Sequence, residues 1–310
     1  MAAYFRSMLE RSKVLLRPFV PKGVRELLGR LRASDERRSI ARTEQALGNA
    51  PGSNEWLGRA DLEKLCAEFP FPPAYGYGED AFEKRGNERA AQILGALPDQ
   101  GAIEFLDLAC LDGMTAAVLQ RQGKRCWAVD LEIKNIDPRA RAAGVQVGKM
   151  DAMALDFPAD RFDAVYSFNA FEHFADPTAA LNEALRVTKP GGHVFLHFGP
   201  LYGSAKGMHA YYHIPVPYCQ FLFPLDMMNA YLRERGSQEL DPHHCNRWTV
   251  RQFRELWSSV LGKAEIVESA EFRNTGSLEL VQRYPSCFKG KIEGIDDLLV
   301  NIMHIVLRKR

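Results

Sequence analysis

Three acidic residues follow or lie within apolar stretches in the middle of the chain. Asp107 belongs to the stretch 103–108, Asp130 follows the stretch 126–129, and Asp151 closes a short segment further on. Asp130 comes about 20 residues after Asp107, the spacing at which an acid after a second parallel strand reaches a ribose diol. A carboxylate accepts hydrogen bonds from both hydroxyls of such a diol. We therefore expect a nucleoside site at the carboxyl edge of a parallel sheet, the alternative being that these acids only end strands and cap turns.

The glycine pattern after the first of these strands narrows the choice of nucleoside. A dinucleotide fingerprint needs G-x-G-x-x-G, because the backbone must approach a pyrophosphate at a helix N-terminus. Residues 107–113 read DLACLDG and contain only Gly113. A pyrophosphate is therefore disfavoured. The pattern fits a nucleoside without a pyrophosphate, which the protein backbone needs to approach closely at only one or two positions.

These segments, with FDAVYSFNAFEHF at 162–174 and RVTKPGG at 186–192, resemble the class I S-adenosylmethionine-dependent methyltransferases over roughly residues 80–200. The resemblance implies S-adenosylmethionine as cofactor, with Asp151 accepting from the adenine amine and Ala152 packing on the ring. It implies cofactor binding by Asp107, Ala109, Gly113, Asp130, Leu131, Asp151, Ala152 and Asn169. The family usually has glycine where Ala109 and Leu111 stand, and Leu111 is not expected to adopt a positive φ comfortably.

Two histidines are the candidate catalytic residues. His173 directly follows the fourth strand and His209 lies in the variable segment after the next one, so either could accept a proton from an acceptor hydroxyl. Each could equally be a structural residue. His209 and His213 are spaced i, i+4, but the Glu of H-E-x-x-H is missing and Gly and Pro surround them, so we expect no metal site. Tyr202, Tyr211 and His213 are candidate substrate contacts.

The resemblance implies an α/β fold, with a doubly wound, mostly parallel, seven-stranded sheet and an antiparallel edge hairpin. The sequence pattern indicates where several elements lie. Helices are expected at 61–69, 79–97 and from Asp176 to Val187, and after Thr249, with the last two strands at 264–272 and 300–307. Asp176 and Thr249 are the predicted helix caps.

The domain organisation follows from composition along the chain. Residues 1–58 are predicted to be a basic helical extension with a linker at 43–58, and residues 59–310 a methyltransferase domain with a substrate-side insertion at about 200–245. The aromatic loop at 70–80 offers Tyr75 and Tyr77 as lid residues over the cofactor.

Charge and composition set further limits. The chain has 310 residues, 46% of them hydrophobic, and its six cysteines show no C-x-x-C pair, which is typical of a reducing, cytoplasmic compartment. Residues 1–42 carry eleven Lys/Arg and four Asp/Glu, whereas the whole chain is +1. The amphipathic segment after Pro21 could lie on an anionic membrane surface, or pack on the domain or on a second subunit. Since the rest of the chain is net acidic, nucleic acid is disfavoured as a partner.

The expected reaction is methyl transfer from S-adenosylmethionine to a hydroxyl of a glycan or another small polar acceptor. The glycan assignment rests on a resemblance of the long insertions and of the final segment to methyltransferases found with bacterial surface-polysaccharide genes. The alternative hypothesis for an enzyme is methylation of a lipid-like or quinone-type acceptor. A third hypothesis is a non-catalytic binding module, because Ala109 and Leu111 depart from the family pattern.

Overall fold

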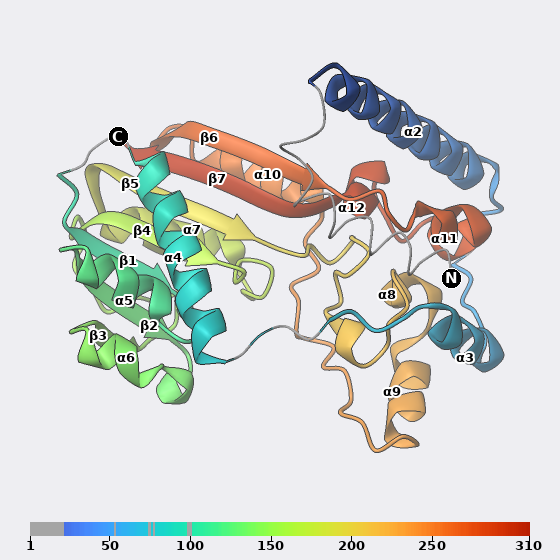
Figure 1. The fold of residues 1–310 in the computed structure, drawn as a ribbon, viewed down its shortest axis with the longest axis horizontal. Coiled ribbons are helices and arrows are strands. Elements are labelled where there is room, and N and C mark those ends of the chain that lie inside the picture. Colours follow the sequence, from blue (N-terminus) through green and yellow to red (C-terminus); the bar gives the residue numbers. More distant parts are fainter. Residues whose placement is uncertain (1–21, 53, 74–75, 77, 98–100) are drawn as a thin grey trace.

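A mixed seven-stranded sheet forms the centre of the molecule (Figure 1), in a computed structural model that describes residues 22–310 apart from 53, 74–75, 77 and 98–100. The strand order is β3-β2-β1-β4-β5-β7-β6. The strands are β1 (Glu104–Leu108), β2 (Arg125–Asp130), β3 (Gln146–Lys149), β4 (Phe162–Phe168), β5 (Thr188–Phe198), β6 (Ala264–Arg273) and β7 (Val300–Lys309). The predicted doubly wound fold is confirmed.

The direction of the strands defines one functional edge. β1 pairs in parallel with both β2 and β4, so the strand order reverses beside β1. β4 pairs in parallel with β5, and β7 lies antiparallel between β5 and β6, which is the predicted edge hairpin. In open sheets of this kind ligands bind outside the carboxyl ends of the strands where the order reverses. The carboxyl ends of β1, β2, β4 and β5 therefore form the candidate edge.

Helices cover both faces of the sheet (Figure 1). One face carries α4 (Glu79–Ala96), α5 (Met114–Arg121) and α6 (Pro138–Ala142), and the other α7 (Pro177–Val187) and α10 (Val250–Ser259). Each face has its own buried apolar cluster. The predicted caps are confirmed, since Asp176 accepts from two backbone N–H groups of α7 and Thr249 forms a capping box with Gln252.

A separate helical lobe lies beyond the carboxyl ends of β4 and β5 (Figure 1). It has its own apolar core, built from Leu62 and Leu65, from residues 205–240 and from residues 278–299. Its helices are α3 (Arg59–Glu68), α8 (Cys219–Leu222), α9 (Leu225–Arg233), α11 (Leu278–Arg283) and α12 (Ile295–Leu299), and its short 3-10 turns are η3 (Ala210–Tyr212) and η4 (Pro285–Cys287). A further 3-10 turn, η2 (Ile133–Asn135), follows β2 in the sheet part of the molecule. The insertion after β5 and the residues between β6 and β7 thus share one core.

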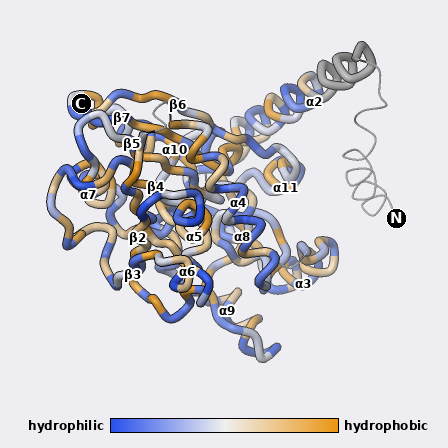
Figure 2. The backbone as a smooth tube through the Cα atoms, turned by 60° about the vertical axis from the view of Figure 1, so that its left-hand side comes forward, coloured by the Kyte–Doolittle hydropathy of each residue, from blue (hydrophilic) through white to orange (hydrophobic). Residues whose placement is uncertain are grey.

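The N-terminal helix is longer than the sequence predicted. α2 spans Lys22–Asn49, so the first part of the expected linker at 43–58 is helical. Tertiary contacts explain the difference: Gln282 of α11 donates to Thr43 Oγ1 at 2.9 Å, and Lys289 Nζ donates to the Gly48 carbonyl at 3.2 Å. Hydrophilic and hydrophobic residues alternate along α2 beside α11 (Figure 2). The side chains of residues 22–32, which include the predicted apolar stripe, lie outside the described set.

Among the helices described, none combines the length and the apolar character that crossing a membrane requires.

Candidate cofactor and acceptor site

The turn between β1 and α5 is held in a left-handed conformation at three positions. The φ angles are 56° at Ala109, 53° at Leu111 and 72° at Gly113. Leu111 thus adopts the positive φ that its side chain disfavours. Two backbone N–H groups fix the turn. That of Leu111 donates to the side-chain Oδ2 of Asp130 at 3.0 Å, and that of Cys110 donates to the Val129 carbonyl at 3.1 Å. The glycine-type geometry therefore persists without the glycines.

Gly113 allows α5 to start close to α6. A Cβ at this position would lie 3.3 Å from the Cβ of Ala140, and its φ is one that L-residues rarely adopt. Gly113 is also the N-cap residue of α5. The helix thus starts at the carboxyl edge of β1, where the Met114 N–H donates to Asp112 Oδ1 at 2.9 Å.

Asp130 ends β2 with both carboxylate oxygens bonded to backbone. Oδ2 accepts from Leu111 N–H, and Oδ1 accepts from Glu132 N–H at 3.2 Å. Each carboxylate oxygen has two lone pairs, so capacity remains for two hydroxyl donors. These bonds orient the carboxylate against the turn after β1. Leu131, beside it, is exposed over 59% of its surface and provides an apolar patch at the same edge.

Asp151 follows β3 and closes a short turn. Its Oδ1 accepts from the Met153 N–H at 2.8 Å, and it forms an isolated bridge with Ala154. Ala152 is buried and Met153 is half-buried against the cluster beneath the sheet. The segment that the resemblance assigns to adenine therefore offers an oriented carboxylate beside apolar side chains.

Asp107 and Asn169 occupy different environments. Asp107 is only 4% exposed, and burial raises its pKa well above the usual range, partly opposed by the charge of Arg89. It therefore lies beneath the turn rather than at the open edge. Asn169 is exposed at the end of β4 with φ of 50°, and its N–H donates to the His197 carbonyl at 2.9 Å.

The two candidate histidines are brought together. The ring centroids of His173 and His209 are 4.8 Å apart, and the ring of His244 lies 4.6 Å from His173 and 5.2 Å from His209. Burial lowers the pKa of His173, and it lowers that of His209 to about 3. Both imidazoles are therefore neutral near pH 7 and offer unprotonated nitrogens.

Glu172 lies directly behind these rings. Its side chain is 1% exposed, its Oε1 accepts from the Gly199 N–H at 3.1 Å, and burial raises its pKa to about 8. Oε2 is buried without a hydrogen-bond partner among the described residues. Such an atom is costly unless something else satisfies it.

The three candidate substrate residues lie in different surroundings. Tyr202 lines a cavity of about 300 Å³ with Trp56, Gln220, Arg247 and Lys291 among its walls. Tyr211 packs toward His209, with ring centroids 6.2 Å apart, and under Lys206. His213 is half-buried after η3 and lies in neither of the residue groups that gather around His173. Tyr75 and Tyr77, the lid candidates, are outside the described residues.

A larger cavity, of about 610 Å³, lies at the opposite edge of the sheet. It is lined by the starts of β4 and β5, including Asp163, Lys189 and Gly192, and by Arg308 at the end of β7. Because ligands of doubly wound sheets bind at the carboxyl ends of the strands, we place the site at the carboxyl edge despite the greater volume at the amino edge.

Several residues at the carboxyl edge were not singled out from the sequence. Asn246 ties the loop before α10 to the end of β4, because its Nδ2 donates to the carbonyls of Phe171 and Phe174 at 2.6 and 3.1 Å. These two hydrogen bonds hold the loop in a position where His244 and Cys245 lie beside His173. Arg89 of α4 lies over the Phe168 ring, 4.8 Å from its centroid. The run HHCN at 243–246 is the signal that could have drawn attention to this loop.

Comparisons with known proteins agree with this geometry. Residues 106–196 match the model of a methyltransferase domain family, and the matched span runs from β1 to β5. The chain is 29% identical over 119 residues to a ubiquinone biosynthesis O-methyltransferase of Alkalilimnicola ehrlichii, covering 34% of this chain and 43% of that protein. It is 34% identical over 117 residues to a demethylmenaquinone methyltransferase of Mycolicibacterium paratuberculosis, covering 37% and 47%.

The chain spans about half the length of these curated relatives. Among solved structures, an S-adenosylmethionine-dependent methyltransferase from Mesorhizobium loti aligns over 72% of this chain and 99% of its own, with 17% identity and a TM-score of 0.46.

Proposed function

We propose that this chain, whose residues 106–196 form a methyltransferase domain, transfers a methyl group from S-adenosylmethionine to a hydroxyl of a glycan or another small polar acceptor. One observation carries the proposal. The Asp130 carboxylate is held by backbone N–H groups at the strand-order reversal, directly against the left-handed turn at Ala109, Leu111 and Gly113.

The roles of the cofactor-binding residues follow from their chemistry. Asp130 accepts from the two ribose hydroxyls with the lone pairs that its backbone bonds leave over. Asp151 accepts from the adenine amine, with Ala152 and Leu131 against the ring. Gly113 and Ala109 allow the backbone to approach the methionine half, while the buried Asp107 supports the turn from below. Asn169 closes this side from the end of β4.

The methyl donor supplies an electrophilic carbon, so the chain mainly has to align the acceptor. Correct alignment near 3 Å can lower the barrier by about 7–11 kcal/mol. The acceptor oxygen forms a bond to the methyl carbon, the sulfur–carbon bond breaks with its electron pair staying on sulfur, and the hydroxyl proton passes to solvent. We assign His173 and His209 to holding the acceptor oxygen rather than to base catalysis, because burial lowers the pKa of both and a base works best near the operating pH.

The nature of the acceptor is supported by the cavity at Tyr202. Aromatic rings of Trp56 and Tyr202 stand beside the charged Arg247 and Lys291, and the buried Oε1 of Gln220 has no hydrogen-bond partner among the described residues. Aromatic faces combined with polar groups suit a sugar ring with polar substituents, and the two cations favour an anionic one. Tyr211 and His213 belong to the same segment after β5.

A quinone-type acceptor is the second candidate. Two of the relatives are named a ubiquinone biosynthesis O-methyltransferase and a demethylmenaquinone methyltransferase, at 29% and 34% identity over 119 and 117 residues. A deep apolar channel would be needed for an isoprenoid chain. Turnover of labelled methyl donor with polysaccharide fragments and with short-chain quinols, in parallel, decides between the two.

The cofactor assignment is tested by calorimetry with S-adenosylhomocysteine. Asp130→Ala should weaken binding by about 2–4 kcal/mol, since two charge-assisted hydrogen bonds are lost. Asp156→Ala, at an exposed acid away from the turn, is the matched control and should bind as the wild type does. Equal affinity of all three proteins would exclude this edge as the cofactor site.

A further inference from the structure

Glu172, His173 and His209 converge from two segments at the carboxyl edge. Glu172 and His173 follow β4, and His209 lies in the segment after β5. One potential ligand atom from each of the three lies within 4.8 Å of those of the other two. The spacing in the sequence does not predict this group. It pairs His209 with His213 at i, i+4, and His213 does not belong to the group.

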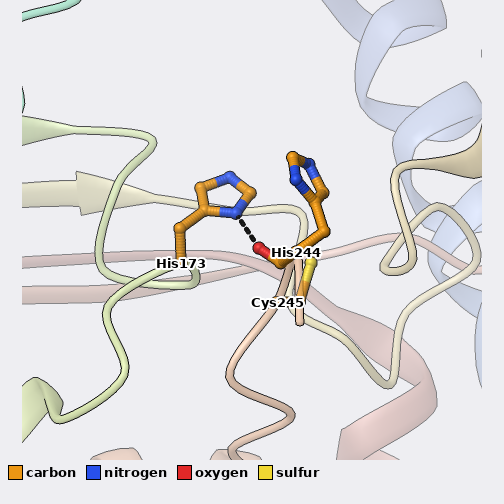
Figure 3. A group of neighbouring side chains, drawn as sticks. All are labelled: His173, His244 and Cys245. Atoms are coloured by element: carbon orange, nitrogen blue, oxygen red, sulfur yellow. Dashed lines mark hydrogen bonds between the residues drawn. The ribbon is translucent and has the colours of Figure 1, made fainter. Parts of the chain in front are cut away.

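Each of the two imidazoles has one nitrogen against a backbone carbonyl. His173 Nδ1 lies 2.5 Å from the His244 carbonyl oxygen (Figure 3), and His209 Nε2 lies 3.2 Å from that of Pro200. An N–H directed at a carbonyl leaves the other ring nitrogen unprotonated and fixes the ring. This is how proteins orient metal-binding histidines. The remaining nitrogen of His173, Nε2, lies 3.8 Å from Glu172 Oε1.

Glu172 is a buried acid with one oxygen unpartnered among the described residues. It is almost fully buried, and its Oε2 has no hydrogen-bond partner within the described part of the chain. Burying a carboxyl in this state is unfavourable unless the group is paired or coordinates a metal. A cation bound between Glu172 and His173 would pair with the carboxylate, whose Oε1 faces His173 Nε2, and would hold the group ionised.

We propose that Glu172, His173 and His209 bind one divalent transition-metal ion. Two imidazoles and one carboxylate suit zinc, iron, cobalt or nickel, and three protein ligands leave coordination positions open. The site goes beyond the proposed methyl transfer and stands on its own contacts.

His244 and Cys245 are assigned to a supporting role. With His173 they form a second group whose candidate atoms are within 4.8 Å of one another. However, His173 faces the His244 carbonyl through Nδ1 (Figure 3), and the Cys245 thiol donates to the Gly207 carbonyl at 3.3 Å. Both contacts fix the backbone around His173 and leave its Nε2 for the ion.

The experiment is metal binding by the full chain without any methyl donor. Cobalt(II) is titrated and followed by its visible absorption, and zinc affinity is measured by competition with a chromophoric chelator. We expect one ion per chain. Glu172→Gln and His209→Ala should each bind about 100-fold more weakly or worse, since even the loss of an outer hydrogen-bond partner costs about 10–100-fold.

The controls separate this site from its alternatives. His213→Ala and His243→Ala, at histidines outside the group, should keep the wild-type affinity. Retained S-adenosylhomocysteine binding shows that each variant is folded, and it also separates this inference from the proposed function. No saturable cobalt or zinc binding by the wild type overturns the inference. A near-ultraviolet sulfur-to-cobalt band that Cys245→Ser removes also overturns it, because the ion would then be bound by the group of His173, His244 and Cys245.

Discussion

Leu111 shows how a single residue can keep a conformation that its type disfavours. Its φ of 53° costs an L-residue about 1–2 kcal/mol, yet its N–H anchors Asp130 at 3.0 Å. The strain is therefore tied to the orientation of the carboxylate that is proposed to hold the ribose. Backbone strain of this kind tends to concentrate at functional sites.

Replacing this residue with glycine should stabilise the protein. Leu111→Gly relieves the left-handed strain and loses little burial, because Leu111 is 45% exposed, so we expect a gain of about 0.5–1 kcal/mol in the free energy of unfolding. Urea denaturation measures it. Leu261 is equally exposed at 45% but has no positive φ, so Leu261→Gly should destabilise instead. A loss of stability in Leu111→Gly would mean that the turn carries no strain.

At the residue level the sequence predicted where the acids lie, but not how the histidines are arranged. Asp130 and Asp151 follow strands whose apolar patterns are local, so their positions at the edge could be predicted. The convergence of His173, His209 and His244 depends on the Asn246 bonds to the end of β4, across more than 70 positions. No local pattern reports such a contact, and neither does it report the burial that lowers the two histidine pKa values.

At the scale of elements, strands and caps were predictable while the N-terminal helix was not. Asp176 and Thr249 cap α7 and α10 as their local sequences indicate. The end of α2 instead depends on tertiary hydrogen bonds from Gln282 and Lys289, residues more than 200 positions away. Residues 106–196 match the model of a methyltransferase domain, while the predicted domain bounds of 59–310 stay a prediction. The division at residue 58 and the peripheral membrane contact stay predictions.

One side chain joins β4 to the start of β1. Asp163 Oδ2 accepts from the N–H groups of Ile103 and Glu104 at 2.9 and 2.8 Å, and its Oδ1 accepts from Lys189 Nζ at 2.7 Å. Partial burial acts to raise its pKa, but these donors outweigh it, and the pKa of Asp163 is lowered. The carboxylate therefore stabilises the fold above its unfolded pKa of about 3.9, and this stabilisation is lost as the pH falls through the lower folded value.

Asp163→Asn should accordingly reduce stability by about 1 kcal/mol at pH 7, allowing for solvent screening. The difference from the wild type should shrink as the pH falls below 4. Urea unfolding at pH 7 and at pH 3 measures both, with Asp156→Asn as an exposed control. A deficit that is the same at both pH values would show that packing, rather than charge, is lost.

The whole molecule consists of a sheet with two apolar faces and a helical lobe with a third core. The carboxyl ends of β4 and β5 point toward this lobe (Figure 1). The proposed cofactor residues belong to the sheet, whereas Tyr202, His209 and Tyr211 belong to the segment that enters the lobe. Cofactor and acceptor should therefore engage different parts of the chain.

Hydrogen exchange tests this division. S-adenosylhomocysteine at 100 times its dissociation constant stabilises the bound state by about 2.7 kcal/mol, which can slow exchange about 100-fold where amides become protected. We expect slowing in peptides covering 108–114, 130–133 and 150–154, and unchanged exchange in 278–288 of the lobe. The slowing should disappear in Asp130→Ala. Protection confined to residues 188–193 would instead assign the nucleoside to the larger cavity at the amino edge. Strand direction argues against that outcome, because the turn, the helix N-terminus and both oriented acids all lie at the other end of the parallel strands.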